Sequence, residues 1–285
     1  MIRVLEPIAN IFDIFHAFWE NLRYERIFSI FLVLTFLLSM LVIEANRLGF
    51  LPHGLSHVVP TNVFYAVNIA FTLLLLQEVV LMILVLPQSF SKSVGKQFEI
   101  LSLILLRSCF KELVNIHEPL LFPQDITPLL RILSDGAGAV AVFMLLAIFV
   151  RVGRVQMRSK GERLYSFVVT KKTISVLLLA IFAGMGIYNL TLGAMGQGMF
   201  SFFPMFYTVL IFCDILLVLV SQVYMPCYVA VFRNSSLALC TVFIRLALSA
   251  PPFYNAAIGV GSALFAVLIV IAHNILLSGR PTARD

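Results

Sequence analysis

Charged side chains are scarce in this chain: they make up 12% of its 285 residues, about half the fraction that is usual in soluble domains. Apolar residues account for 61%, and uncharged stretches such as 173–201 and 246–279 exceed the ~20 residues that a helix needs to cross hydrocarbon. A water-soluble fold could not bury that many apolar side chains. The composition therefore excludes a soluble globular protein and predicts several membrane-spanning helices.

Cysteine is rare as well. The four cysteines lie within or at the ends of apolar stretches, without the CxxC or CxxCH spacing of metal and haem sites: Cys109, Cys213, Cys227 and Cys240. We therefore expect buried thiols and no structural disulfides. His117 and His273 lie toward opposite membrane sides, which disfavours a bis-histidine haem site. The sequence predicts no cofactor and no metal site.

Known catalytic signatures are missing too, because the sequence contains no HExxH, GxSxG, GxGxxG, Walker A or DDxxD pattern. This argues against a hydrolase, a nucleotide-driven pump and a prenyl-transfer enzyme. We expect a protein that is not an enzyme. An intramembrane enzyme with a dispersed site ranks third among the functions considered below.

The apolar segments predict an all-α, polytopic membrane fold. Two of the expected spans are weak, because each is short and carries a central arginine, Arg107 or Arg245. If both were re-entrant, six full crossings would remain. The eight spans are expected at 27–46, 61–87, 97–115, 133–150, 173–193, 203–230, 236–250 and 255–278.

The positions of the twenty lysines and arginines predict the topology. With eight alternating spans, Arg47, Lys111 and Arg131 fall on one side, two arginines lie within spans, and the other fifteen fall on the opposite side. By the positive-inside rule the opposite side is the cytoplasm, which then holds both termini and the 151–172 loop. The net charge of +6 is thus a topology signal, and no nucleic-acid partner is expected.

Residues 1–23 precede the first span and place apolar side chains at helical spacing, with Asp13, His16 and Glu20 on other faces. This pattern is typical of an amphipathic helix that lies on the cytoplasmic membrane surface. The rest of the chain divides into four parts: a four-helix membrane unit at 24–151, a basic linker at 152–170, a second four-helix unit at 171–279 and a tail at 280–285.

The two four-helix units look like an internal duplication. The second span of each carries one acid in an apolar run, Glu78 in the first unit and Asp214 in the second. The third span of each carries Arg107 or Arg245, so the offsets between the units are 136 and 138 residues. Units with an even number of spans run parallel, and we predict that a pseudo-twofold axis along the membrane normal relates them.

The same four residues are the candidate site. Charged groups at membrane depth cost on the order of 2.5 to 3.5 kcal/mol each, so they usually face a partner within the protein. Consecutive antiparallel helices pack side by side, which predicts contacts between Glu78 and Arg107 and between Asp214 and Arg245. Two interpretations stay open: structural ion pairs that fix helix register, or groups in a path for an ion or proton.

Other polar residues could complete such a path. The candidates for its lining are Gln77, Glu99, Lys111, Glu112, Asn68 and Asn189. The basic residues around the 151–172 loop are either solvated at the lipid headgroups or form a docking surface for an acidic protein partner. They are Arg151, Arg154, Arg158, Lys160, Arg163, Lys171 and Lys172.

A four-helix unit with an acid on its second helix resembles a voltage-sensor domain, but the fourth spans lack arginine at every third position, which excludes voltage sensing. We predict a permeation protein, that is, a channel or transporter for an ion or a small solute. The alternative is a non-catalytic membrane subunit that anchors or assembles a larger complex. Either protein would be embedded in a lipid bilayer and could form oligomers.

Overall fold

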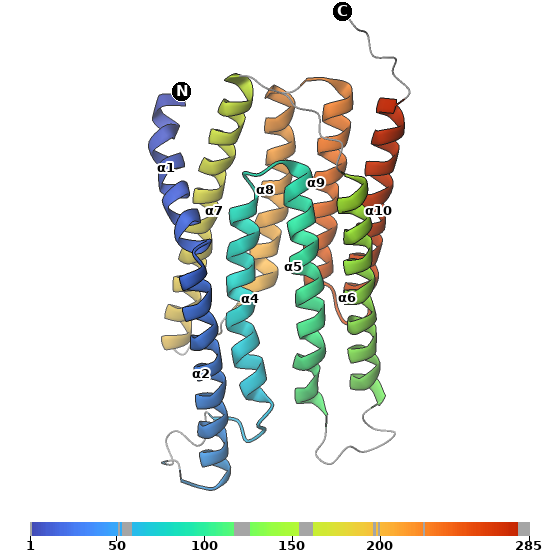
Figure 1. Ribbon diagram of the computed structural model, residues 1–285. Coiled ribbons are helices and arrows are strands. Elements are labelled where there is room, and N and C mark those ends of the chain that lie inside the picture. The colour runs from blue at the N-terminus through green and yellow to red at the C-terminus, as the bar shows by residue number, and fades with distance from the viewer. Residues whose placement is uncertain are drawn as a thin grey trace, which may run out of the picture.

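The computed structural model describes residues 2–50, 52, 59–116, 126–153, 162–195, 198, 200–224 and 226–278, without the side chains of 2–5, 162–164 and 277–278. These residues form α-helices, one short 3-10 helix and no strand (Figure 1), so the predicted all-α fold is confirmed. The elements are α1 (Ile2–Trp19), α2 (Leu22–Arg47), α4 (Tyr65–Val85), α5 (Phe90–Lys111), η1 (Glu112–Asn115), α6 (Ile126–Val152), α7 (Glu162–Ala194), α8 (Phe202–Tyr224), α9 (Tyr228–Ser249) and α10 (Tyr254–Ser278).

Seven of the described helices are long and apolar enough to cross a membrane: α2, α4, α6, α7, α8, α9 and α10. The weak seventh predicted span is part of α9, which extends over 22 residues. The helix α5 is equally long, but it carries five charged residues and is not among the seven. It packs between α4, α6 and α9, while Lys96 and Glu99 lie on its exposed side and pair with each other. The chain is a polytopic helical membrane protein.

Proline and serine set the turn between α4 and α5. The helix α4 ends at Val85, two residues before Pro87, which has no backbone N–H to continue the helical hydrogen bonds. Ser89 then begins α5, because its side-chain oxygen accepts a hydrogen bond from the backbone N–H of Lys92 at 3.4 Å. This short turn holds α4 and α5 antiparallel and side by side, which is the arrangement that the predicted ion pair requires.

The helices form two layers (Figure 1). In the view shown, α2, α4, α5 and α6 follow one another from left to right in the front layer, and α7, α8, α9 and α10 follow in the same order behind them. One apolar cluster joins α5 and α6 to α9 and α10, and another joins α4 to α7 and α8. A twofold axis along the helices would reverse the order of the second layer, so the predicted pseudo-twofold relation is wrong.

The layers are also shifted along the helix axis, and α4, α5 and α6 reach below the lower ends of α8, α9 and α10 (Figure 1). Asn255, near the start of α10, donates a hydrogen bond to Asp135 of α6 at 2.9 Å, so residues 126–134 of α6 lie below α10. Close contact holds this register: a Cβ at Gly138 would lie only 2.7 Å from the Cβ of Ala256. The shift leaves a step at the lower end of the bundle.

The N-terminal helix α1 runs beside α7 (Figure 1). One face of α1 packs against the bundle, since Phe12 is buried in a cluster with Val80 and Leu84 of α4. The Lys172 ammonium on α7 bonds both carboxylate oxygens of Asp13 at 2.7 Å. The amphipathic helix predicted at the N-terminus is therefore present. It lies along the bundle, whereas a helix flat on the membrane surface would run across the bundle end.

Candidate functional site

The first acid–arginine pair joins α4 to α5. Nη1 of Arg107 donates a hydrogen bond to Oε1 of Glu78, so the neighbouring helices bring together the two residues that the sequence predicts. Glu78 is only 4% exposed, whereas the side chain of Arg107 is 26% exposed. A buried carboxylate is thus balanced by a guanidinium that still reaches open space.

The second pair joins α8 to α9 and is deeper and looser. Nε of Arg245 lies 3.6 Å from Oδ2 of Asp214, too far for a normal hydrogen bond, and both residues are buried. Nη1 of Arg245 donates instead to the sulfur of Met82 at 2.8 Å. Nε and Nη2 have no hydrogen-bond partner within the described residues. Two charges are therefore held out of water with few hydrogen bonds, which is costly for stability.

The two pairs lie about one helical turn apart. Met82 follows Glu78 by four residues on α4, which at ~1.5 Å per residue is about 6 Å along the axis. Tyr207 of α8 lines the cavity at Glu78 and interacts electrostatically with Arg245. We refer to Glu78, Arg107, Asp214 and Arg245 together as the buried charge cluster.

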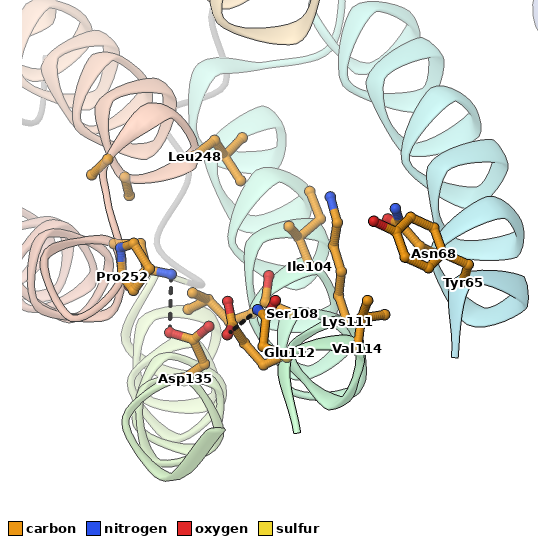
Figure 2. Close-up of a pocket in the computed structure, with 15 residues that line it drawn as sticks. Tyr65, Asn68, Ile104, Ser108, Lys111, Glu112, Val114, Asp135, Leu248 and Pro252 are labelled. Carbon is orange, nitrogen blue, oxygen red and sulfur yellow. Dashed lines mark hydrogen bonds between the residues drawn. The ribbon is translucent and has the colours of Figure 1, made fainter. Parts of the chain in front are cut away.

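Two cavities lead to this cluster from the lower end of the bundle. The lower cavity, of about 360 Å³, lies at the step between the layers, where Tyr65 of α4, Asp135 of α6 and Asn255 of α10 line it (Figure 2). The upper cavity, of about 260 Å³, is lined by Glu78 and Arg107. The cavities adjoin, because four residues line both: Ile104, Ser108, Lys111 and Leu248.

The lower cavity has an acidic side. Asp135 is 2% exposed, and its Oδ1 accepts the hydrogen bond from Asn255 that Figure 2 draws as a dashed line. Glu112, at the start of η1, lies 3.5 Å from Arg131 and accepts a hydrogen bond from Asn115 at 2.9 Å. The charge of Glu112 is thus partly balanced by a neighbour, whereas Asp135 is held by a neutral amide.

Above the buried charge cluster the interior is closed. A third space, lined by Asp214 and Gln97, measures about 10 Å³ and has room for about one water molecule. Beyond it the ammonium of Lys171 donates a hydrogen bond to the Gln88 carbonyl at 2.9 Å and lies 4.2 Å from the ring centroid of Phe90. The cavities therefore reach the cluster from the lower end, and the space that Asp214 lines on its other side is small.

The chain matches no family model, no curated protein and no solved structure. Within the ranges that the structure describes, no group of three or more His, Cys, Asp or Glu side chains is arranged to hold a metal ion. The function must therefore be argued from the cavities and their charges.

The predicted docking residues do not form one surface. Lys171 is only 2% exposed, so its side chain lies inside the bundle and away from the surface where docking was predicted. Lys172 is engaged by Asp13, and Arg151 is exposed. The other predicted docking groups lie outside the described residues: Arg154, Arg158, Lys160 and the side chain of Arg163.

Half of the predicted lining residues reach the lower cavity. Glu99 instead forms an ion pair with Lys96 at 2.6 Å on the side of α5 that is partly exposed. Asn189 bonds the backbone of Phe200 through both amide atoms and so holds the connection from α7 to α8. Gln77 is half-buried and lines none of the three spaces. Those that line the lower cavity are Asn68, Lys111 and Glu112.

Sequence reasoning missed three residues of the site. Asp135 stands at the start of the predicted span 133–150, and an acid at membrane depth usually has a functional partner, so a signal was present. Met82 and Asn255 carry no such signal, because one is an ordinary apolar residue and the other follows a proline turn.

Proposed function

We propose that this protein is a membrane transporter for an ion or a small polar solute. The observation that carries the proposal is the pair of adjoining cavities, which extends from the lower end of the bundle to Glu78 and Arg107. A purely structural ion pair needs no open space beside it. A cavity that ends at buried charges gives a polar solute a place to bind inside the bilayer.

In this proposal the lower end of the bundle faces away from the cytoplasm. Lys92, Lys96 and Arg233 lie near the opposite end, where α1 begins and α10 ends. Lysine and arginine accumulate on the cytoplasmic side of membrane proteins. Both termini are then cytoplasmic, and the cavities open outward.

The buried charge cluster serves as the gate in this mechanism. Asp214 and Arg245 make few hydrogen bonds in the outward-open arrangement, so a shift that brings them into full contact gains electrostatic energy. We interpret 24–151 and 171–279 as tandem repeats stacked with the same helix order. One acid–arginine pair then faces the outer cavity and its equivalent closes the path behind it.

A second candidate function is that of a membrane subunit that anchors or assembles a larger complex. The observation that favours it is α2, since only 6% of its apolar window is buried within the chain. Such a helix faces lipid in the isolated protein and would face a neighbouring subunit in a complex.

Thiol accessibility tests the outward-open path. Ser108 lies where the two cavities adjoin, and Ser93, on the same helix, lines the closed space above the cluster. In a cysteine-free background in intact cells, Ser108→Cys should react with a membrane-impermeant thiol reagent and Ser93→Cys should not. Protection of Ser108→Cys, or equal reaction at both positions, would contradict the proposed path.

Flux decides between transport and assembly. Proteoliposomes are placed in hyperosmotic potassium chloride, glycerol or glycine, and light scattering reports how fast they swell again as the solute enters. We expect at least one solute to enter faster than in protein-free vesicles, and this entry to be lost after thiol labelling of Ser108→Cys. Entry at the protein-free rate for all three, with subunits that co-purify from native membrane, would favour assembly.

A further inference from the structure

The joined cavities contain a positive charge without a partner. Lys111 lines both cavities, and its ammonium forms no hydrogen bond and no ion pair with any residue that the structure describes. In Figure 2 the Lys111 side chain extends toward Asn68, away from Asp135. Lys111 is exposed at the end of α5, so its ammonium is available to an anionic group of whatever fills the space.

The opposite side of the lower cavity has a negative charge, which is buried. Asp135 is buried, with 2% of its surface exposed. Its only hydrogen bond from a described residue comes from a neutral amide, Asn255. No described cation lies within ion-pair distance of its carboxylate, since Arg131 of the same helix pairs with Glu112. A buried carboxylate of this kind is stabilised by a cationic group that binds beside it.

A third observation indicates that the occupant is polar. Oδ1 of Asn68, which also lines the lower cavity, is buried without a hydrogen-bond partner within the described residues. Unsatisfied buried acceptors are rare in folded proteins and usually mark a bound water or ligand. Besides Glu112, which pairs with Arg131, the cavity thus presents a cation, an unpaired carboxylate and an orphan amide oxygen to one space of about 360 Å³, a size common for small-molecule sites.

A single ionic solute would satisfy one of the two charges and be repelled by the other. A solute that carries both an ammonium and a carboxylate satisfies both, and it enters the membrane with no net charge. We propose that the joined cavities bind a small zwitterion of the amino-acid type, with its carboxylate on Lys111 and its ammonium on Asp135. The inference rests on the proposed transport function, because it names the class of solute that the outward cavity takes.

Binding is measured by calorimetry on the full-length protein in lipid nanodiscs. The probes are glycine, β-alanine and 4-aminobutyrate, which separate the two charges by increasing distances, together with acetate and methylammonium at equal ionic strength. We expect one chain length among the zwitterions to bind at least tenfold more tightly than either single ion. Acetate or methylammonium binding as tightly as every zwitterion, or no zwitterion binding at all, would overturn the inference.

Two variants assign the charges. Lys111→Met and Asp135→Asn should each weaken binding of the preferred zwitterion at least tenfold. Asp135→Asn keeps the side-chain volume and an acceptor for Asn255, so the fold is retained, and unfolding temperatures verify this. Lys92→Met, at the far end of α5, is the matched control and should bind as the parent does. Binding that is equally weak in the control would contradict a role for Lys111.

The outcomes for the solute and for transport are separable. Binding of a zwitterion without faster entry into proteoliposomes would overturn transport and leave the site in place. Faster entry of potassium chloride or glycerol with no zwitterion binding would overturn the inference and leave transport in place.

Discussion

Replacing Arg245 tests how charge is held inside the bundle. Arg245→Met leaves the carboxylate of Asp214, which is 2% exposed, without its counter-charge. Breaking a buried pair in this way typically costs ~3 to 5 kcal/mol. Changing both residues, Asp214→Leu with Arg245→Met, replaces the pair by apolar side chains, which is often neutral or stabilising by ~1 to 4 kcal/mol. Because two donors of Arg245 have no hydrogen-bond partner within the described residues, we expect the double variant to be the more stable of the two by a wide margin.

The chain's own thiols provide the assay. Three free cysteines are buried and react with a fluorogenic maleimide once the structure opens, while Cys227 is exposed and is changed to serine to lower the background. A loss of 1 kcal/mol lowers the unfolding temperature by ~2 to 4 °C in domains of 150 to 250 residues. Arg245→Met should therefore unfold on the order of 10 °C below the parent, and the double variant at or above it.

Two results would refute this reasoning. An Arg245→Met variant as stable as the parent would mean that Asp214 does not depend on a counter-charge. A double variant as unstable as Arg245→Met would mean that the pair itself supports the fold. The matched comparison is Arg107→Leu with and without Glu78→Gln, where we expect a smaller loss, because the side chain of Arg107 is 26% exposed to the cavity.

Three further changes test the closed end, the layer contact and the N-terminal helix. Lys171→Met removes the buried ammonium from its carbonyl acceptor and should cost ~1 to 3 kcal/mol in the thiol assay; an unchanged unfolding temperature would contradict this. Gly138→Ala places a Cβ 2.7 Å from a side chain of α10, so the layers must separate at a cost of about 1 to 3 kcal/mol, whereas Gly261→Ala meets open space and should be neutral. Lys172→Ala unpairs Asp13 and should speed proteolysis between α1 and α2; a cleavage rate equal to that of the parent would exclude an anchoring role for this contact.

The contacts within consecutive helices were predictable. Glu78 and Arg107 stand on helices joined by a short turn, and Glu78 is the lone charge of its apolar run, so membrane energetics favours a partner on the next helix. The same argument applies to Asp214 and Arg245, although it gives no indication of the 3.6 Å separation or of the contact with Met82.

The arrangement of the two layers was not predictable from apolar periodicity. It depends on where helices distant in sequence touch, as at Gly138 with Ala256, and those contacts leave no mark in either helix alone. Lys171 and Lys172 illustrate the same limit. They are adjacent and identical, yet their side chains point in directions about 100° apart on α7, so one is buried under Phe90 and the other pairs with Asp13.

The step between the layers also shapes the electrical profile of the membrane. In the proposed outward-open arrangement, a cavity filled with solution carries the potential of the outer solution inward to the level of Glu78. The membrane voltage would then fall mainly across the closed part between Met82 and Lys171. Moving one elementary charge through 100 mV changes its energy by ~2.3 kcal/mol. A charged solute, or the Arg245 guanidinium itself, would therefore experience most of this energy within a displacement of a few helical turns.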